Sequence, residues 1–143
     1  MIHYSLHPES VVWRFWDYGT PGSNLFEEWY SSQSEAARDT IDGILKVCSK
    51  VEDHHQWLSF KRRLKGKYAA HKIWEMQFRS DKREYRILGI FGIKRKEAIL
   101  LMGCYHKDGN YTPPAALDTA LDRAKNFKLG KGKVRERKIK TDL

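Results

Sequence analysis

Residues 71–105 read HKIWEMQFRSDKREYRILGIFGIKRKEAILLMGCY, and this stretch decides the fold. It holds three runs with the composition of strands: His71–Arg79, Glu84–Phe91 and Glu97–Tyr105. The links between the runs cover residues 80–83 and 92–96, which is short enough for antiparallel hairpins. The sequence therefore predicts an antiparallel sheet of three to four strands.

The runs differ in how their side chains alternate. In the first run Trp74, Met76 and Phe78 alternate with polar residues, so one face of that strand is expected to be buried and the other polar. The third run contains 98–102, which is apolar at every position. Because a strand buried on both faces lies inside a sheet, we expect this run to be the central strand.

The first half of the chain predicts one strand and two helices. Residues 11–16 are rich in β-branched and aromatic residues and precede a turn, which predicts a strand. A short helix is expected to begin near Ser23 or Asn24. A longer helix follows, with Ser32 as N-cap and Glu35 three residues later in a capping box.

After the three runs, Thr112 as N-cap and Pro113 in the first turn predict a last helix. The order strand, helix, helix, three to four strands, helix predicts an α+β fold with the helices on one side of the sheet. We expect residues 1–127 to form a single domain. Residues 128–143 are basic and poor in apolar side chains, so we expect a mobile C-terminal tail.

Composition excludes several classes of protein. The chain has 143 residues, and a chain of this length buries about two-thirds of its surface, so a core needs neither disulfides nor a metal. Cys48 and Cys104 lack a C-x-x-C spacing, which favours reduced thiols packed in the core of a cytoplasmic protein. No apolar run approaches the roughly 20 residues of a membrane span, so we expect a soluble protein without membrane association.

The net charge of +9 is concentrated in two blocks. Residues 61–107 contain 14 basic and 4 acidic side chains, and residues 128–143 contain 7 and 2, whereas residues 1–60 contain 4 and 9. Basic blocks on an otherwise acidic chain indicate a surface for a polyanion, with nucleic acid as the first candidate. Lysines that only keep the protein in solution are the alternative. The side chains expected to contact RNA phosphates are Lys61, Arg62, Arg63, Lys65, Lys67 and Lys72.

Several short motifs occur in a characteristic order between Val11 and Phe127. They are Phe26-Glu27-Glu28-Trp29, Leu64-Lys65-Gly66, Ile73-Trp74-Glu75-Met76 leading to Arg79, Tyr85-Arg86-Ile87-Leu88, Ile99-Leu100-Leu101 running into Tyr105-His106-Lys107, and Thr112-Pro113 followed by Ala120 and Ala124. In these motifs the chain resembles the RelE/ParE toxin superfamily, and specifically its phage-derived HigB-like branch. It departs from that pattern where His106 replaces one of two lysines, and where the loop 108–111 is longer.

The resemblance implies a RelE-like fold and the toxin of a type II toxin–antitoxin pair. Many such toxins cut mRNA in the ribosomal decoding site without a metal ion, and a protein antitoxin neutralises them. We therefore expect a metal-independent, ribosome-dependent mRNA endonuclease without a cofactor. Its partners would be mRNA on the ribosome and a cognate antitoxin with a helix-turn-helix. The alternatives are a non-enzymatic inhibitor of a partner such as DNA gyrase, a basic nucleic-acid-binding phage or mobile-element protein, and a nuclease that acts on naked RNA.

RNA cleavage of this kind requires activation of a 2′-hydroxyl, stabilisation of charge on phosphorus and protonation of a 5′-oxygen. Arg79 and Arg86, near the ends of adjacent strands, suit charge stabilisation because a guanidinium binds two phosphate oxygens, although both could form cross-strand salt bridges instead. His106 suits general acid or base catalysis, and Lys107 suits phosphate binding. Tyr105 is expected either to stack on a base or orient the scissile phosphate, or else to pack as a half-buried aromatic.

Two weaker candidates remain. Glu75 is either a base or an arginine partner, and the second role is favoured. The adjacent His54 and His55 rarely converge on one ion in proteins, and no zinc-type spacing accompanies them, so we expect no metal site.

Overall fold

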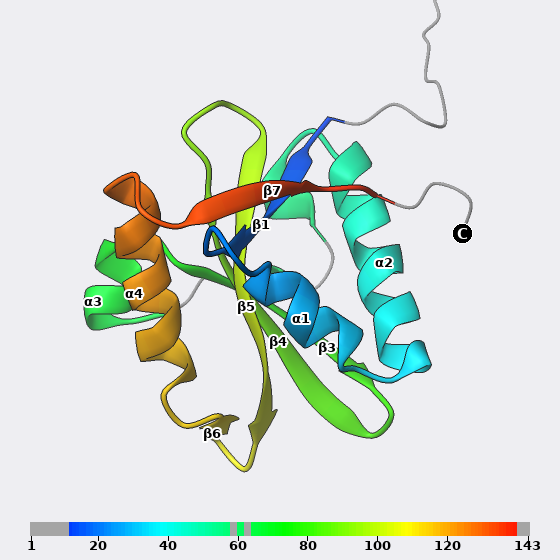
Figure 1. Cartoon of the computed structure of the whole chain (residues 1–143). Helices are drawn as coiled ribbons and strands as arrows, with labels where there is room; N and C mark the ends of the chain where they lie inside the picture. The colour runs from blue at the N-terminus through cyan, green and yellow to red at the C-terminus, as the bar shows by residue number, and fades with distance from the viewer. Residues whose placement is uncertain (1–11, 58–59, 62–63, 140–143) are drawn as a thin grey trace, which may run out of the picture.

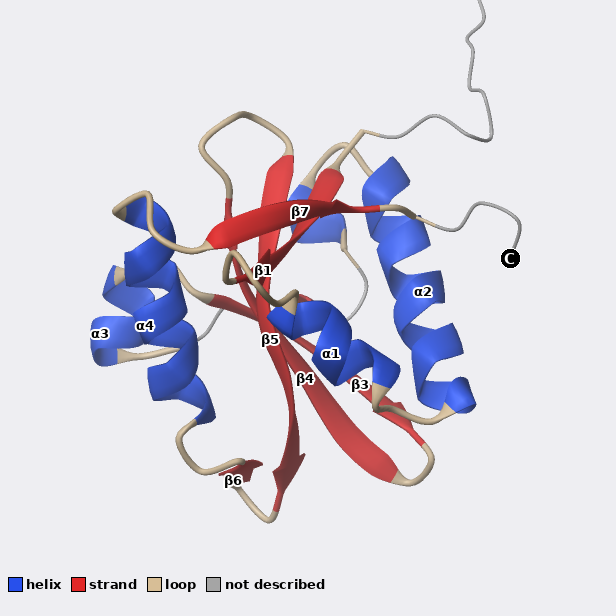
Figure 2. Ribbon diagram, in the orientation of Figure 1, coloured by secondary structure: helices blue, strands red, loops and turns tan. Residues whose placement is uncertain are grey.

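The computed structural model describes residues 12–57, 60–61 and 64–139 (Figure 1). Its elements are β1 (Arg14–Gly19), α1 (Leu25–Ser31), α2 (Glu35–Lys50), a 3-10 turn η1 (His54–Gln56), β2 (Phe60–Lys61), α3 (Gly66–Ala70), β3 (Trp74–Ser80), β4 (Arg83–Phe91), β5 (Glu97–Lys107), β6 (Asn110–Thr112), α4 (Ala116–Lys128) and β7 (Lys133–Arg137). The predicted α+β class is confirmed, as are the three strands within residues 71–105 (Figure 2).

The strands form one sheet in the order β2-β3-β4-β5-β1-β7, with β6 added beside β5. The predicted central strand is confirmed, because β5 pairs with β4, with β1 and with β6. The sheet is mixed rather than antiparallel, since β1 runs parallel to β5. A parallel pair needs a long crossover, and here α1, α2 and three strands lie between the two partners in sequence.

Helices cover both faces of the sheet, whereas the sequence predicted helices on one side only. Under α1 and α2 lies a cluster that includes Phe15, Phe26 and Ile87, and we call this side the α1/α2 face. Under α4 lies a second cluster that includes Leu88 and Ala120, and we call this side the α4 face. Figure 1 shows α1 and α2 on one side of the strands and α4 on the other. The reason is that β4 presents apolar side chains to both faces of the sheet, so both faces must be covered.

A β-bulge in β5 determines which of its side chains face which helices. Leu88 of β4 lies opposite Met102, but the next pair is Gly89 with Leu100, so Leu101 has no opposite residue. One extra residue shifts the alternation of a strand by one position. Leu100 therefore packs on the α1/α2 face, and Met102, two residues later, packs on the α4 face. Beyond the bulge, each side chain of β5 therefore points to the face opposite to the one it would take in a regular strand.

Two predicted helix starts are wrong. The N-cap of α2 is Ser34, whose side chain accepts a hydrogen bond of 3.1 Å from a backbone N–H of the first turn. Ser32 instead ends α1, and its hydroxyl donates to a carbonyl of that helix. Thr112 pairs with Tyr105 in β6, and α4 begins only at Ala116. In both cases the predicted N-cap, Ser32 or Thr112, already belongs to the preceding element. The helix therefore begins at a polar or small residue further along the chain.

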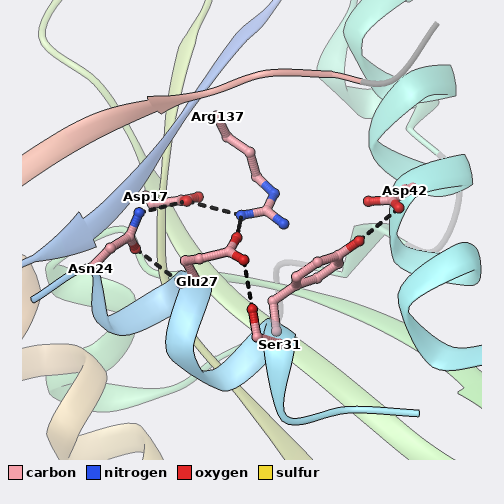
Figure 3. A network of polar contacts seen from close by, with 7 residues as sticks. Asp17, Asn24, Glu27, Ser31, Asp42 and Arg137 are labelled. Atoms are coloured by element: carbon pink, nitrogen blue, oxygen red, sulfur yellow. Dashed lines mark hydrogen bonds and ion pairs between the residues drawn. The ribbon is translucent and has the colours of Figure 1, made fainter. Parts of the chain in front are cut away.

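The expectation of a mobile tail after residue 127 is wrong for residues 133–137, which form β7. This strand lies antiparallel to β1 across the top of the sheet in Figure 1. Nη1 of Arg137 donates to Asp17 at 2.9 Å and to Glu27 at 2.8 Å, as Figure 3 shows. A polar strand is stable here because its partners on β1 and α1 are already held by the core. Within the described residues, no helix is long and apolar enough to cross a membrane.

Candidate active site

Two tight hairpins meet at one end of the sheet. The β3–β4 turn has φ values of 52° at Asp81 and 62° at Lys82, and the β5–β6 turn has 54° at Asp108 and 81° at Gly109. Positive φ at both central residues matches a type I′ turn, whose twist suits a two-residue hairpin. The second hairpin replaces the expected loop over residues 108–111. Its Asp-Gly pair is the sequence signal that predicts such a turn.

A cleft of about 720 Å³ lies between these hairpins. It contains four of the five predicted catalytic residues and several neighbours that sequence reasoning did not select. The lining residues are Arg79, Asp81, Lys82, Arg83, Glu84, Tyr105, His106, Lys107, Asp108 and Thr112. The end of β5 and the β3–β4 hairpin therefore line the same open cleft.

The side chains of Tyr105 and His106 leave β5 on opposite faces of the sheet. The Tyr105 ring packs against the α1/α2 cluster, with its centroid 5.2 Å from that of Tyr85. The His106 ring lies on the other side, perpendicular to Tyr111 of β6 at 5.0 Å between centroids. Because the strand ends in the cleft, both faces contribute groups to one site.

Tyr105 is held in place by two contacts. Its hydroxyl donates to Oε1 of Gln33 at 2.7 Å, and Nε2 of Gln33 donates to the carbonyl of Trp29 at 2.8 Å. The guanidinium of Arg83 lies 4.3 Å from the ring centroid. An ordered aromatic ring under a guanidinium is a surface on which a nucleobase can stack. No sequence signal marked Gln33 or Arg83 as part of the site, although Arg83 lies two residues before the Tyr85-Arg86-Ile87-Leu88 motif.

The charges of the cleft nearly balance. Nη1 of Arg79 lies 2.8 Å from Oε2 of Glu84, and the Arg79 side chain is 64% exposed. An exposed pair of this kind contributes at most about 1 kcal/mol, so a phosphate can replace the carboxylate. With neutral His106, the lining carries four positive groups, Arg79, Lys82, Arg83 and Lys107, and three negative ones, Asp81, Glu84 and Asp108.

Arg86 does not line the cleft. It is buried on the α4 face, where it lies opposite Cys104 in the sheet. Its Nη1 donates to the Tyr85 carbonyl at 3.0 Å, and its Nε lies 3.9 Å from Oε2 of Glu75. Glu75 is therefore an arginine partner. The Arg86 guanidinium is thus buried beside a carboxylate and does not line the cleft itself.

Three of the six residues expected to contact RNA phosphates have described side chains, and these three lie outside the cleft. Lys65, Lys67 and Lys72 belong to α3 and its flanks, and none of them lines the cleft. Lys67 pairs with Asp118 of α4 at 3.2 Å, which places α3 beside α4. Lys61 lies in β2 opposite Glu75, and Arg62 and Arg63 lie outside the described residues.

One group of described residues presents three metal-ligating atoms within 4.8 Å of one another, namely Asp53, His54 and His55. Oδ1 of Asp53 already lies 2.9 Å from Nδ1 of His55. His54 packs against Phe91, whose ring centroid is 4.6 Å away, at the opposite end of β4 from Glu84. This group therefore takes no part in the cleft.

Comparison with known proteins gives one match. A protein-family model described as "Phage derived protein Gp49-like (DUF891)" matches residues 28–125. The matched region runs from α1 into α4 and contains both hairpins of the cleft. No curated protein and no solved structure gives a significant match. The chain belongs to the phage-derived Gp49-like family.

Proposed function

We propose that this protein is the toxin of a type II toxin–antitoxin pair and cleaves mRNA on the ribosome. The observation that carries the proposal is the cleft, which His106 lines together with Arg79, Lys82, Arg83 and Lys107, and which Tyr105 lines from the opposite face of the same strand. The resemblance to RelE/ParE and HigB-like toxins and the phage-derived family support the same function. That resemblance also implies a cognate antitoxin and cleavage without a metal ion.

Each group has a role in this reaction. The 2′-oxygen forms a bond to phosphorus while the bond from phosphorus to the 5′-oxygen breaks. A proton leaves the 2′-hydroxyl, and another is added to the 5′-oxygen. His106 carries one of these transfers and solvent carries the other. Arg79 and Lys107 stabilise the charge on the phosphate oxygens. Tyr105 stacks on a neighbouring base.

The near balance of charge in the cleft favours ribosome dependence. A cleft with four positive and three negative groups attracts free RNA weakly, because affinity for a polyanion grows with the number of phosphates neutralised. The ribosome would supply the positioning that the cleft lacks. The exposed Lys65 and Lys72, which lie outside the cleft, can contact ribosomal RNA while the cleft holds mRNA.

A translating lysate tests the proposal. The wild-type protein is added, and mRNA ends are mapped by primer extension. We expect discrete cuts with the wild type and a loss of cleavage rate of about 100-fold or more for His106→Ala. Lys94→Ala is the matched control, because Lys94 is exposed on the β4–β5 link, away from the cleft. Intact mRNA without discrete cuts would contradict cleavage and favour the non-enzymatic inhibitor, and a gyrase supercoiling assay would then test whether gyrase is its target.

A further inference from the structure

A buried polar cluster adjoins the cleft on the α4 face. Oε1 of Glu75 accepts a hydrogen bond from the Tyr111 hydroxyl, and its Oε2 accepts one of 2.8 Å from Gln77. Nε of Arg86 faces that same Oε2 at 3.9 Å. The side chains of Glu75 and Arg86 are only 8% and 9% exposed. We call Glu75, Arg86 and the half-buried Tyr111 the buried cluster.

His106 contacts Tyr111 of this cluster and is the sheet partner of Glu84, whose side chain lies near Arg86. In the sheet it lies between Glu84 of β4 and Tyr111 of β6, as the opposite residue of each. Its ring stands perpendicular to the Tyr111 ring, with an interplanar angle of 87° and 5.0 Å between centroids. On the other side, Oε1 of Glu84 lies 3.7 Å from Nη1 of Arg86. Both neighbours of the imidazole are thus connected to buried groups.

The cluster is held together by its burial. Burial, and after it the hydrogen bond to Glu75, raise the pKa of Tyr111, so its hydroxyl remains a donor at neutral pH. Nε of Arg86 is buried and makes no hydrogen bond within the described residues. Removing one member of such a buried ion pair leaves the other charge without compensation. The position of each group therefore depends on the others.

We propose that Glu75, Arg86 and Tyr111 position the His106 imidazole in the cleft. Tyr111 fixes the plane of the ring, and Glu75 fixes Tyr111 through its hydroxyl. Arg86 lies near the carboxylates of both Glu75 and Glu84 and fixes the positions of these two side chains. In this account Arg86 is a positioning residue that does not touch RNA, and Tyr111 is a residue of the site that the sequence did not mark. The proposal rests on the proposed function, because it gives His106 a task in RNA cleavage.

Two substitutions of Tyr111 separate its ring from its hydroxyl. Tyr111→Phe keeps the ring beside His106 and removes the donor to Glu75, whereas Tyr111→Leu removes both. We expect Tyr111→Leu to lower the rate of mRNA cleavage on the ribosome by roughly 10- to 100-fold with KM nearly unchanged. Tyr111→Phe should lower the rate less than Tyr111→Leu, because the ring stays beside His106 but is no longer fixed by Glu75. Urea unfolding confirms that each variant is folded before it is assayed.

Nuclear magnetic resonance gives a readout that does not depend on cleavage. In Tyr111→Leu the ring signals of His106 should move, because the aromatic ring beside it is gone. In Tyr111→Phe those signals should move less than in Tyr111→Leu, because the ring remains but is no longer fixed by Glu75, and the Nε–H signal of Arg86 should move, because Glu75 has lost a donor. Glu75→Gln should move the same Arg86 signal.

The two proposals fail in different ways. If folded Tyr111→Leu keeps both the wild-type His106 signals and the wild-type cleavage rate, the positioning role is wrong. If the wild type does not cut mRNA at all, the proposed function is wrong, and the His106 signals alone decide whether Tyr111 orders the ring. If Tyr111→Leu does not fold, Tyr111→Phe and Glu75→Gln still test the cluster through the Arg86 signal, and an unmoved signal in both overturns it.

Discussion

Nη1 of Arg137, in the last strand, lies 2.9 Å from Oδ2 of Asp17, in the first strand, and both side chains are buried. The same guanidinium contacts Glu27 of α1 (Figure 3). It also lies 4.2 Å from the ring centroid of Tyr30. One arginine thus ties β7, β1 and α1 together. The C-terminal segment is part of the folded domain because of this contact and the β1–β7 ladder.

Arg137→Ala should destabilise the protein by about 3–5 kcal/mol, because it leaves the buried Asp17 carboxylate without its cation. Urea unfolding at pH 7 measures this loss. Lys138→Ala, at an exposed neighbour, is the control and should change stability by less than about 0.5 kcal/mol. An equal effect of the two substitutions would mean that the Asp17 contact contributes nothing.

The cost of Arg137→Ala should also depend on pH. Burial raises the pKa of Asp17 although Arg137 lowers it, and without Arg137 the pKa rises further. A carboxyl whose folded pKa is raised stabilises the fold while it is protonated, and this stability is lost as the pH rises through the folded pKa. The difference between variant and wild type should therefore shrink as the pH falls from 7 towards 4. A difference that is constant with pH would exclude Asp17 as its source.

Gly103→Ala should destabilise the packing of α1 on β5. A Cβ at this position would lie 2.3 Å from ring atoms of Trp29. Overpacking of this kind costs about 1–3 kcal/mol. Gly43→Ala is the matched control in α2, where a Cβ meets nothing within 4 Å, and it should stabilise the protein by about 0.5–1 kcal/mol. In the double variant Gly103→Ala with Trp29→Leu, the costs should be less than additive, as thermal unfolding of all four proteins would show.

Lys82→Gly should raise stability and lower activity together. Lys82 holds a φ of 62° in the β3–β4 turn, a conformation that costs a residue with a side chain about 1 kcal/mol relative to glycine. The same substitution removes a cation from the cleft, for which we expect a loss of cleavage rate of about tenfold. Lys82→Ala removes the cation but keeps the backbone strain. It should match Lys82→Gly in the cleavage assay and fall below it in thermal stability.

The thiol of Cys104 should be unreactive in the folded protein. It is buried on the α4 face, and burial raises its pKa to about 12. The thiolate, which is the reactive form, is therefore absent at pH 8. A thiol reagent such as 5,5′-dithiobis(2-nitrobenzoic acid) should label neither Cys104 nor the buried Cys48 at that pH, and both after denaturation. Rapid labelling of native protein would show that the sheet opens locally.

Much of the fold was predictable from local patterns. The alternation around Trp74 and the apolar run before Cys104 predicted two strands of the sheet and placed β5 at its centre. Asn24 caps α1 where the sequence predicted a start. These features depend on residues within a few positions of one another, so local sequence patterns are sufficient to predict them. The β5–β6 hairpin was equally local, and its Asp-Gly pair was the signal that went unused.

The sequence by itself determined the α+β class, the central strand and the location of the charged and imidazole groups in the second half of the chain. Only the tertiary structure decided how those groups are used. The bulge at Leu101 shifted the alternation at the end of β5 by one residue, and so put Tyr105 on the α1/α2 face and His106 on the α4 face. Formation of the sheet also buried Arg86. Asp17, far from Arg137 in sequence, fixed the position of Arg137 through an ion pair. The face to which a side chain points, and whether it is buried, depend on contacts between residues far apart in sequence. Those contacts exist only once the sheet has formed.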